Sequence, residues 1–370
     1  MVSLILLSLA VTIDQAKTIN PIVAPIKFFF SGDPVIAISI DGKEPQEFGL
    51  TMTTRHSIVV KGDDAGSAKQ LSINGKPFAT ANLESAGASV HPVLNALGLG
   101  VLKSMAIGVD YAKNEITFWP GGKLTPEAAK AWILKAPKWG GESKVWTTPI
   151  KRRAEVAPVV TLTIGVKKAE MLLRIGQQGT SFARGEDPTT GIGVEYGPGG
   201  NHALMSRVGV GSVSVPWMLY FKGVSYDPRK EIDPSIVGLF TVDNLLARRV
   251  ILDLPGDAMY AEQLTSDEQI SMFLSEWFQM PIDVQGDKMV LREMPSTKFY
   301  PQLTPIYESE ILEIMGQPAK QLLDASRDIT DAHTTYLKQL FERVWQGYRV
   351  KFKRTSGEVV EATFSPPKAG

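Results

Sequence analysis

The chain contains no cysteine and only four histidines among its 370 residues. Without thiols, disulfide bridges, thiolate chemistry and cysteine-ligated zinc sites are excluded. Basic and acidic residues balance at 39 each, so no charge excess favours nucleic acid as a partner. No apolar run reaches the roughly 18 residues that a membrane-spanning helix needs, and we therefore expect no transmembrane segment in the mature chain.

The histidines are too scattered to predict a metal site. They stand at His56, His91, His202 and His333, and no two have the spacing of metal ligands. We expect neither a metal nor a cofactor. His56 lies beside Thr54 and Ser57 but lacks the Gly-x-Ser-x-Gly frame of a serine nucleophile, so we interpret it as a loop histidine that faces solvent.

Residues 1–16 differ from the rest of the chain. The short apolar stretch Leu4–Val11 is followed by Asp14-Gln15-Ala16, a pattern typical of a secretory signal peptide, although the usual positive residues before it are absent. The alternative is a buried first strand. A signal peptide predicts an exported protein that is periplasmic, secreted or part of the cell envelope.

Short apolar stretches separated by turn signals fill residues 26–262. Val35–Ile40 ends at Asp41-Gly42, and another stretch ends at Asn74-Gly75; both dipeptides are strong hairpin signals. A second set of strands opens with Val159–Ile164, and Thr125 is the predicted N-cap of a joining helix over residues 126–134. This spacing predicts a mainly β fold of barrel or sandwich type.

Within the second set of strands, residues 185–200 form a Gly- and Pro-rich loop. After residue 262 the pattern changes, and residues 288–295 and 310–319 are predicted strands. Residues 332–345 have apolar side chains at helical spacing. A hairpin that turns at Ser356-Gly357 closes the chain.

The two sets of strands resemble the retropepsin-like aspartic proteases. In that family a strand ends in an Asp-Thr/Ser-Gly triplet, and an apolar Leu-Gly segment follows later. Here the triplets are Thr51-Met52-Thr53 and Arg174-Ile175-Gly176, and the later segments are 96–102 and 236–240. The resemblance implies two tandem β-barrel lobes in a pepsin-like bilobal arrangement. Both catalytic aspartates are lost.

The order of the C-terminal elements resembles a PDZ domain of the bacterial type, in which a Gly-Asp-x-Ile-Leu-x-Ile-Asn-Gly segment precedes a helix and a final hairpin. Here that segment is residues 309–316. Retropepsin-like lobes followed by a PDZ domain are a bacterial combination. Residues 274–280 take the place of the carboxylate-binding loop but contain no glycine. The expected divisions are a signal peptide 1–16, a first lobe 26–122, a linker 123–150, a second lobe 151–264 and a small α+β PDZ-like domain 268–366.

Aspartic proteases need two carboxylates that share one proton. Thr51 has no acidity near neutral pH, Arg174 is permanently cationic, and residues 51–60 and 172–182 contain no Asp or Glu. We therefore predict a catalytically inactive protein that binds a peptide or protein segment, acidic or C-terminal, through the binding residues Thr51, Thr53, Arg174 and Gly176. The alternatives are an active aspartic-type endopeptidase with displaced catalytic residues, or a structural envelope component.

Three side chains carry further expectations. Arg174 either holds a ligand carboxylate or bonds backbone carbonyls and plugs the space between the lobes. Asp110 and Asp253 each follow an apolar strand and precede a turn. Because Asp commonly accepts backbone N–H bonds in turns, we expect both to have that structural role.

Overall fold

The computed structural model describes residues 20–28, 33–60, 62–86, 95–135, 144–154, 157–176, 180–183, 194–196, 202–211, 213–224, 228–245, 247–278, 280–292, 306–327, 331–344 and 346–364. The predicted signal peptide lies outside these residues. No helix of the described part has the length and apolar character needed to cross a membrane.

Two lobes share one strand order. The first lobe contains β2 Lys27–Phe28, β3 Pro34–Ile40, β4 Gln46–Leu50, β5 Ser57–Val59, β6 Gly66–Ile73, β7 Lys76–Ser85 and β8 Asn95–Leu97. The second lobe contains β12 Lys151–Arg153, β13 Ala157–Ile164, β14 Lys167–Arg174, β15 Thr180–Ala183, β16 Val194–Tyr196, β17 His202–Val210, β18 Val213–Val224 and β19 Ile236–Thr241. Their short helical turns are η1 Gly62–Asp64, α1 Leu99–Leu102, α3 Pro228–Glu231 and η2 Val242–Leu245.

The equivalence of the lobes follows from strand pairing. The first sheet has the order β2-β3-β4-β8-β5-β7-β6, and the second has the order β12-β13-β14-β19-β15-β18-β17-β16. In each lobe the second strand also pairs with the strand near the far end, β3 with β6 and β13 with β17, which closes the sheet. The parallel pairs match as well, since β4–β8 corresponds to β14–β19. The expected mainly β fold with two tandem lobes is therefore confirmed.

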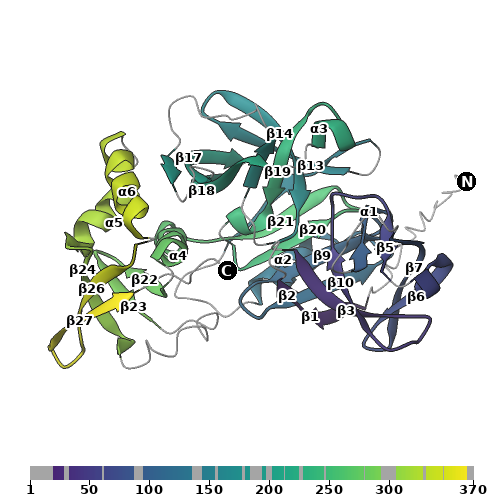
Figure 1. Ribbon diagram of the computed structural model, residues 1–370, viewed down its shortest axis with the longest axis horizontal. Helices are drawn as coiled ribbons and strands as arrows, with labels where there is room; N and C mark the ends of the chain where they lie inside the picture. The colour runs from purple at the N-terminus through teal and green to yellow at the C-terminus, as the bar shows by residue number, and fades with distance from the viewer. Residues whose placement is uncertain are drawn as a thin grey trace, which may run out of the picture.

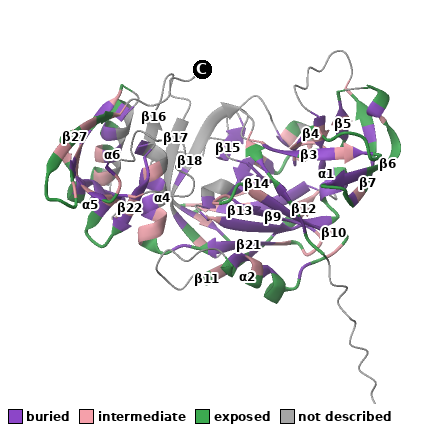
Figure 2. Ribbon diagram, turned by 90° about the horizontal axis from the view of Figure 1, so that it is seen from below, coloured by how far each residue is buried: buried purple, intermediate pink, exposed green. Residues whose placement is uncertain are grey.

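A shared sheet joins the lobes. It has six strands in the order β1-β10-β9-β20-β21-β11. Their bounds are β1 Ile22–Pro25, β9 Met105–Asp110, β10 Glu115–Pro120, β11 Lys144–Pro149, β20 Arg249–Asp253 and β21 Ala258–Gln263. Helix α2, Pro126–Leu134, covers one face of this sheet (Figure 2). The Thr125 hydroxyl accepts the Ala128 N–H at 3.2 Å, which confirms the predicted N-cap.

Local sequence explains the hairpins. Asp41 and Gly42 have φ values of 50° and 75°, and Asn74 and Gly75 have values of 50° and 74°. These left-handed conformations suit Asn, Asp and Gly, and they match the right-handed twist of the flanking strands. Alternate residues of the strands then face inward, and one apolar core extends through both lobes and the shared sheet.

The C-terminal region is an α+β unit with its own apolar core, which lies beside the lobes (Figure 1). Its sheet has the order β22-β23-β24-β26-β27, with β25 paired to β24. Its strands are β22 Ile282–Gln285, β23 Lys288–Leu291, β24 Ser309–Ile314, β25 Gln317–Pro318, β26 Tyr348–Lys353 and β27 Val359–Phe364, and its helices are α4 Ser266–Phe278, α5 Ala319–Arg327 and α6 Asp331–Val344.

Three local predictions were wrong. The strand expected over 310–319 ends at Ile314, because Met315 and Gly316 have φ values of 56° and 77° and turn the chain into β25 and α5. The loop expected near residues 274–280 is largely the last turns of α4, whose Leu274 and Phe278 are fully buried. Strand β16 lies within the loop expected over 185–200, whose other residues are outside the described part.

Candidate functional site

The two triplets follow equivalent strands. In the first lobe Leu50 pairs with Leu97, and the Thr51 N–H donates to the Leu97 carbonyl at 3.0 Å. In the second lobe Arg174 pairs with Thr241. Parallel pairing therefore places Thr51 and Arg174 at the same position of their lobes, each at the carboxyl end of the strand.

The same register corrects the alignment of the later segments. Gly238 pairs with Met171 and Phe240 with Leu173, so Phe240 is the counterpart of Leu97, and Thr241 is the counterpart of Gly98. A Cβ atom at Gly98 would lie 2.1 Å from the His56 carbonyl oxygen. The first-lobe loop thus packs directly on the Gly98 backbone, whereas the second lobe has a threonine in that place.

The first loop is closed by its own hydroxyl groups. Thr51 Oγ1 and Thr53 Oγ1 lie 2.8 Å apart, and the Thr53 N–H donates to Thr51 Oγ1 at 3.3 Å. Backbone bonds fix the rest of the loop, because the Leu99 N–H donates to the Thr54 carbonyl at 2.9 Å. Neutral hydroxyls can donate and accept hydrogen bonds but have no acidity near neutral pH.

The second loop begins with an ion pair. Arg174 Nη2 and Nε lie 2.7 and 3.0 Å from Asp33 Oδ1. The Arg174 side chain is 13% exposed and that of Asp33 is 27% exposed. Asp33 comes immediately before β3 of the first lobe, so the ion pair connects the lobes. Arg174 does hold a carboxylate, but one from its own chain, which is neither of its two expected roles.

Gly176 contacts the turn between β9 and β10 of the shared sheet. Its carbonyl accepts the Tyr111 hydroxyl at 3.2 Å, and the Tyr111 ring stacks on Phe28 with centroids 6.2 Å apart. Among the four predicted binding residues, Thr51 and Thr53 thus bond each other, while Arg174 and Gly176 contact Asp33 and Tyr111. No local signal points to Asp33, because it is 141 residues from Arg174 in the chain.

Asp110 and Asp253 occupy equivalent places in the shared sheet, and both accept turn N–H groups as expected. Asp110 accepts from Lys113 at 3.2 Å. Asp253 accepts from Gly256 at 3.0 Å and from Leu124 at 3.2 Å. Burial raises the pKa of the Asp253 carboxyl, against the lowering effect of these two N–H donors.

Only Asp110 has a close cationic partner in this sheet position. Arg249 Nη2 lies 2.6 Å from Asp110 Oδ2, and both side chains are about as buried as the core, at 5% and 4% exposure. The guanidinium also lies 5.0 Å from the centre of the Trp132 ring and donates to the Trp132 carbonyl. The residue opposite Asp253 is Ala106, so the second position has no equivalent arginine.

His56 is confirmed as an exposed loop residue, with 62% of its side chain exposed and Nδ1 2.6 Å from Glu84 Oε1. His91 lies outside the described residues. Across the part of the chain that the structure describes, no three His, Asp or Glu side chains gather in a way that suits a metal ion.

No protein-family model and no curated protein matches the sequence. Among solved structures, the aspartic proteinase from Irpex lacteus is similar with a TM-score of 0.41 and 8% identity, over 67% of this chain and 98% of that one. Conglutin gamma, a basic 7S globulin from lupine seeds, gives 0.40 and 11% over 66% and 95%. A retropepsin-like aspartic protease from Rickettsia conorii gives 0.23 and 12% over 34% and 97%. The two-lobed fold itself is established by the duplicated strand order.

Proposed function

We propose that this chain is a catalytically inactive protein on an aspartic-protease-like scaffold, which is exported and binds a peptide or protein segment. The observation that carries the proposal is the content of the two equivalent loops, a threonine pair in one and an arginine in the other. The proposed division is a signal peptide 1–16, lobes 26–122 and 151–264 joined by residues 123–150, and a PDZ-like domain 268–366.

The chemistry supports inactivity for a simple reason. Peptide hydrolysis by two carboxyl groups needs one that accepts a proton and one that donates it. A threonine hydroxyl does neither near neutral pH, and an arginine stays protonated. Asp33 contacts Arg174, so its carboxylate is engaged in an ion pair, and this partner is a guanidinium and not a second carboxyl group.

The same groups suit recognition of a carboxylate. A guanidinium binds carboxylates with charge-assisted hydrogen bonds, often two at once. Arg174 is already positioned by its contact with Asp33. A peptide carboxylate, from an acidic side chain or a C-terminus, would bind by replacing Asp33. Competition with the internal carboxylate predicts modest affinity in the wild-type protein.

Calorimetric titration with an acidic peptide tests this competition. Asp33→Asn removes the competing charge, and we expect about tenfold tighter binding, equivalent to about 1.4 kcal/mol. Arg174→Ala should abolish binding, and Arg174→Lys should weaken it because lysine lacks the planar fork of donors. Glu47→Gln is a matched control, since Glu47 pairs with the exposed Lys27 elsewhere in the first lobe. Unchanged binding in Arg174→Ala would refute the site.

A further inference from the structure

Among the described residues, the main path of the C-terminal sheet ends in two outer strands, β22 and β27. An outer strand presents unpaired N–H and C=O groups, and extended peptides bind such edges by adding a strand. The contacts of β22 show how one of these edges is used. Its inner side pairs with β23, in the register Ile282 with Leu291 and Val284 with Met289.

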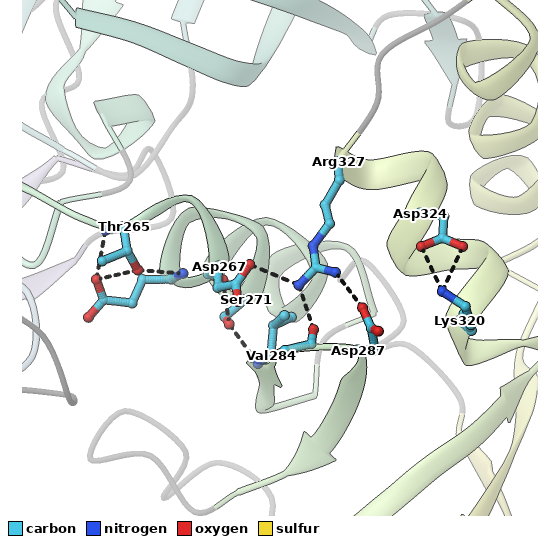
Figure 3. Close-up of polar contacts among 10 residues, drawn as sticks. Thr265, Asp267, Ser271, Val284, Asp287, Lys320, Asp324 and Arg327 are labelled. Atoms are coloured by element: carbon cyan, nitrogen blue, oxygen red, sulfur yellow. Dashed lines mark hydrogen bonds and ion pairs between the residues drawn. The ribbon is translucent and has the colours of Figure 1, made fainter.

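Two serines of helix α4 bond the outward N–H groups of β22. The Ser271 hydroxyl accepts the Val284 N–H at 2.8 Å (Figure 3). The Ser275 hydroxyl accepts the Ile282 N–H at 2.9 Å and lies 3.1 Å from the Ile282 carbonyl oxygen. Each hydroxyl also bonds a carbonyl one turn earlier in α4, of Asp267 and Ser271 respectively.

The geometry of a helix and a strand explains why serines at this spacing fit. Four helical residues rise about 6.0 Å, and two strand residues span about 6.6 Å. Ser271 and Ser275 are therefore spaced like Val284 and Ile282, with α4 running antiparallel to β22. A serine hydroxyl has one proton and two lone pairs, so it satisfies a helix carbonyl and a strand N–H together.

Packing and charge hold α4 in this place. Its residues Ile270, Phe273, Leu274 and Phe278 all belong to the core of the C-terminal unit. Thr265 and Glu268 form a capping box at its first turn. Arg327 at the end of α5 contacts Asp267 of α4 and Asp287 of the β22–β23 turn (Figure 3). Displacing α4 would expose four large apolar side chains and two strand N–H groups to water.

We propose that α4 is an intramolecular occupant of the β22 edge, which closes this edge of the C-terminal unit to strand addition by a peptide. Ser271 and Ser275 supply the hydrogen bonds that a ligand backbone would otherwise make. The inference is independent of the function proposed above, because that site lies on the lobes.

Hydrogen–deuterium exchange resolved to single amides tests the occupancy. We expect Ser271→Ala to speed exchange at Val284 at least tenfold with little change at Ile282, and Ser275→Ala to do the reverse. Ser326→Ala is the matched control, since it removes a buried helical serine of α5 that also bonds the carbonyl one turn earlier. Equal effects of Ser271→Ala and Ser326→Ala at Val284 would overturn the assignment.

A second measurement uses the wild-type protein and does not depend on any variant folding. The probe is a decapeptide that ends in valine with a free carboxylate, compared with its C-terminal amide. We expect neither form to change exchange over residues 271–284. Changes confined to residues 51–56 and 174–176 would support the lobe site and leave β22 closed. Faster exchange in α4 with continued protection of Ile282 and Val284 would show that the peptide replaces the helix, and would refute the inference.

Discussion

The two lobes have the same strand order but carry different side chains in their equivalent loops. Thr51 and Gly98 in the first lobe correspond to Arg174 and Thr241 in the second. Asp110 is paired with a buried arginine, whereas its counterpart Asp253 lies opposite an alanine. The duplicated fold therefore depends on apolar alternation and strand register, and it tolerates divergence at its loops and sheet termini.

The largest expected effect comes from removing the arginine that only Asp110, and not its counterpart Asp253, has as a partner in the described sheet. Arg249→Ala leaves Asp110 as a buried charge without its partner, and we expect a loss of about 3–5 kcal/mol in the free energy of unfolding. Urea denaturation measures it. The double variant Asp110→Asn/Arg249→Leu should lose less than the sum of its single variants, because no charge remains unpaired. A loss below about 1 kcal/mol in Arg249→Ala would contradict this account.

A smaller effect is expected where the first loop packs on glycine. Gly98→Ala forces the His56 backbone away from the new methyl group, and overpacking of this kind costs up to about 3 kcal/mol. Gly49→Ala is the control in the adjacent strand, since its Cβ would meet only the Asn95 carbonyl oxygen at 3.7 Å. Thermal denaturation compares them. Equal stability of the two variants would refute the close packing at Gly98.

The two loops should also differ in their response to salt. Asp33→Asn weakens the Arg174 contact and is expected to cost about 1 kcal/mol, because the amide still accepts a hydrogen bond. That cost should shrink as salt is added, since screening weakens the wild-type ion pair. Thr51→Val removes only a neutral hydroxyl pair, so its cost should not vary with salt. Parallel salt dependence in urea titrations would contradict the assignment.

The smallest effect concerns the pH dependence contributed by Asp253. Its folded-state pKa is raised above the ordinary value of 3.8 by burial. As pH rises from that value to the folded-state pKa, the unfolded chain ionises first, so the free energy of unfolding falls. Asp253→Asn lacks this titration. The free energy of unfolding of the wild type minus that of the variant should therefore decrease with pH in this window. A difference that stays flat or rises would show that burial does not disfavour the charged form of the Asp253 carboxyl.

The sequence predicts the parts of this fold that are locally encoded. Asp41-Gly42 and Asn74-Gly75 adopt the expected turns because few residue types tolerate positive φ. Thr125 caps α2 through a bond to a residue three positions away. The places of Thr51 and Arg174 were also predicted, since each comes at the end of an apolar strand.

Contacts between distant residues were not predictable in the same way. The Asp33–Arg174 pair and the Arg249–Asp110 pair join strands that meet only after folding. The register error at Ile236–Thr241 arose because the Leu-Gly pattern of the first lobe was matched to Gly238, whereas strand pairing makes Thr241 the counterpart of Gly98. Helix α4 was missed although Ile270, Phe273, Leu274 and Phe278 have helical spacing, because the PDZ resemblance placed a loop there. Only its bonds to β22 depend on the folded structure.

The central claim is that the paired loops of this protein do not form a proton-sharing acid couple. The most direct measurement is digestion of a denatured protein pool by the purified chain across acid and neutral pH, with and without a statine-type inhibitor. We predict no inhibitor-sensitive cleavage at any pH, with wild type and the double variant Thr51→Val/Arg174→Ala indistinguishable. Cleavage by the wild-type chain that the inhibitor blocks would contradict the claim and support an active endopeptidase with displaced catalytic residues.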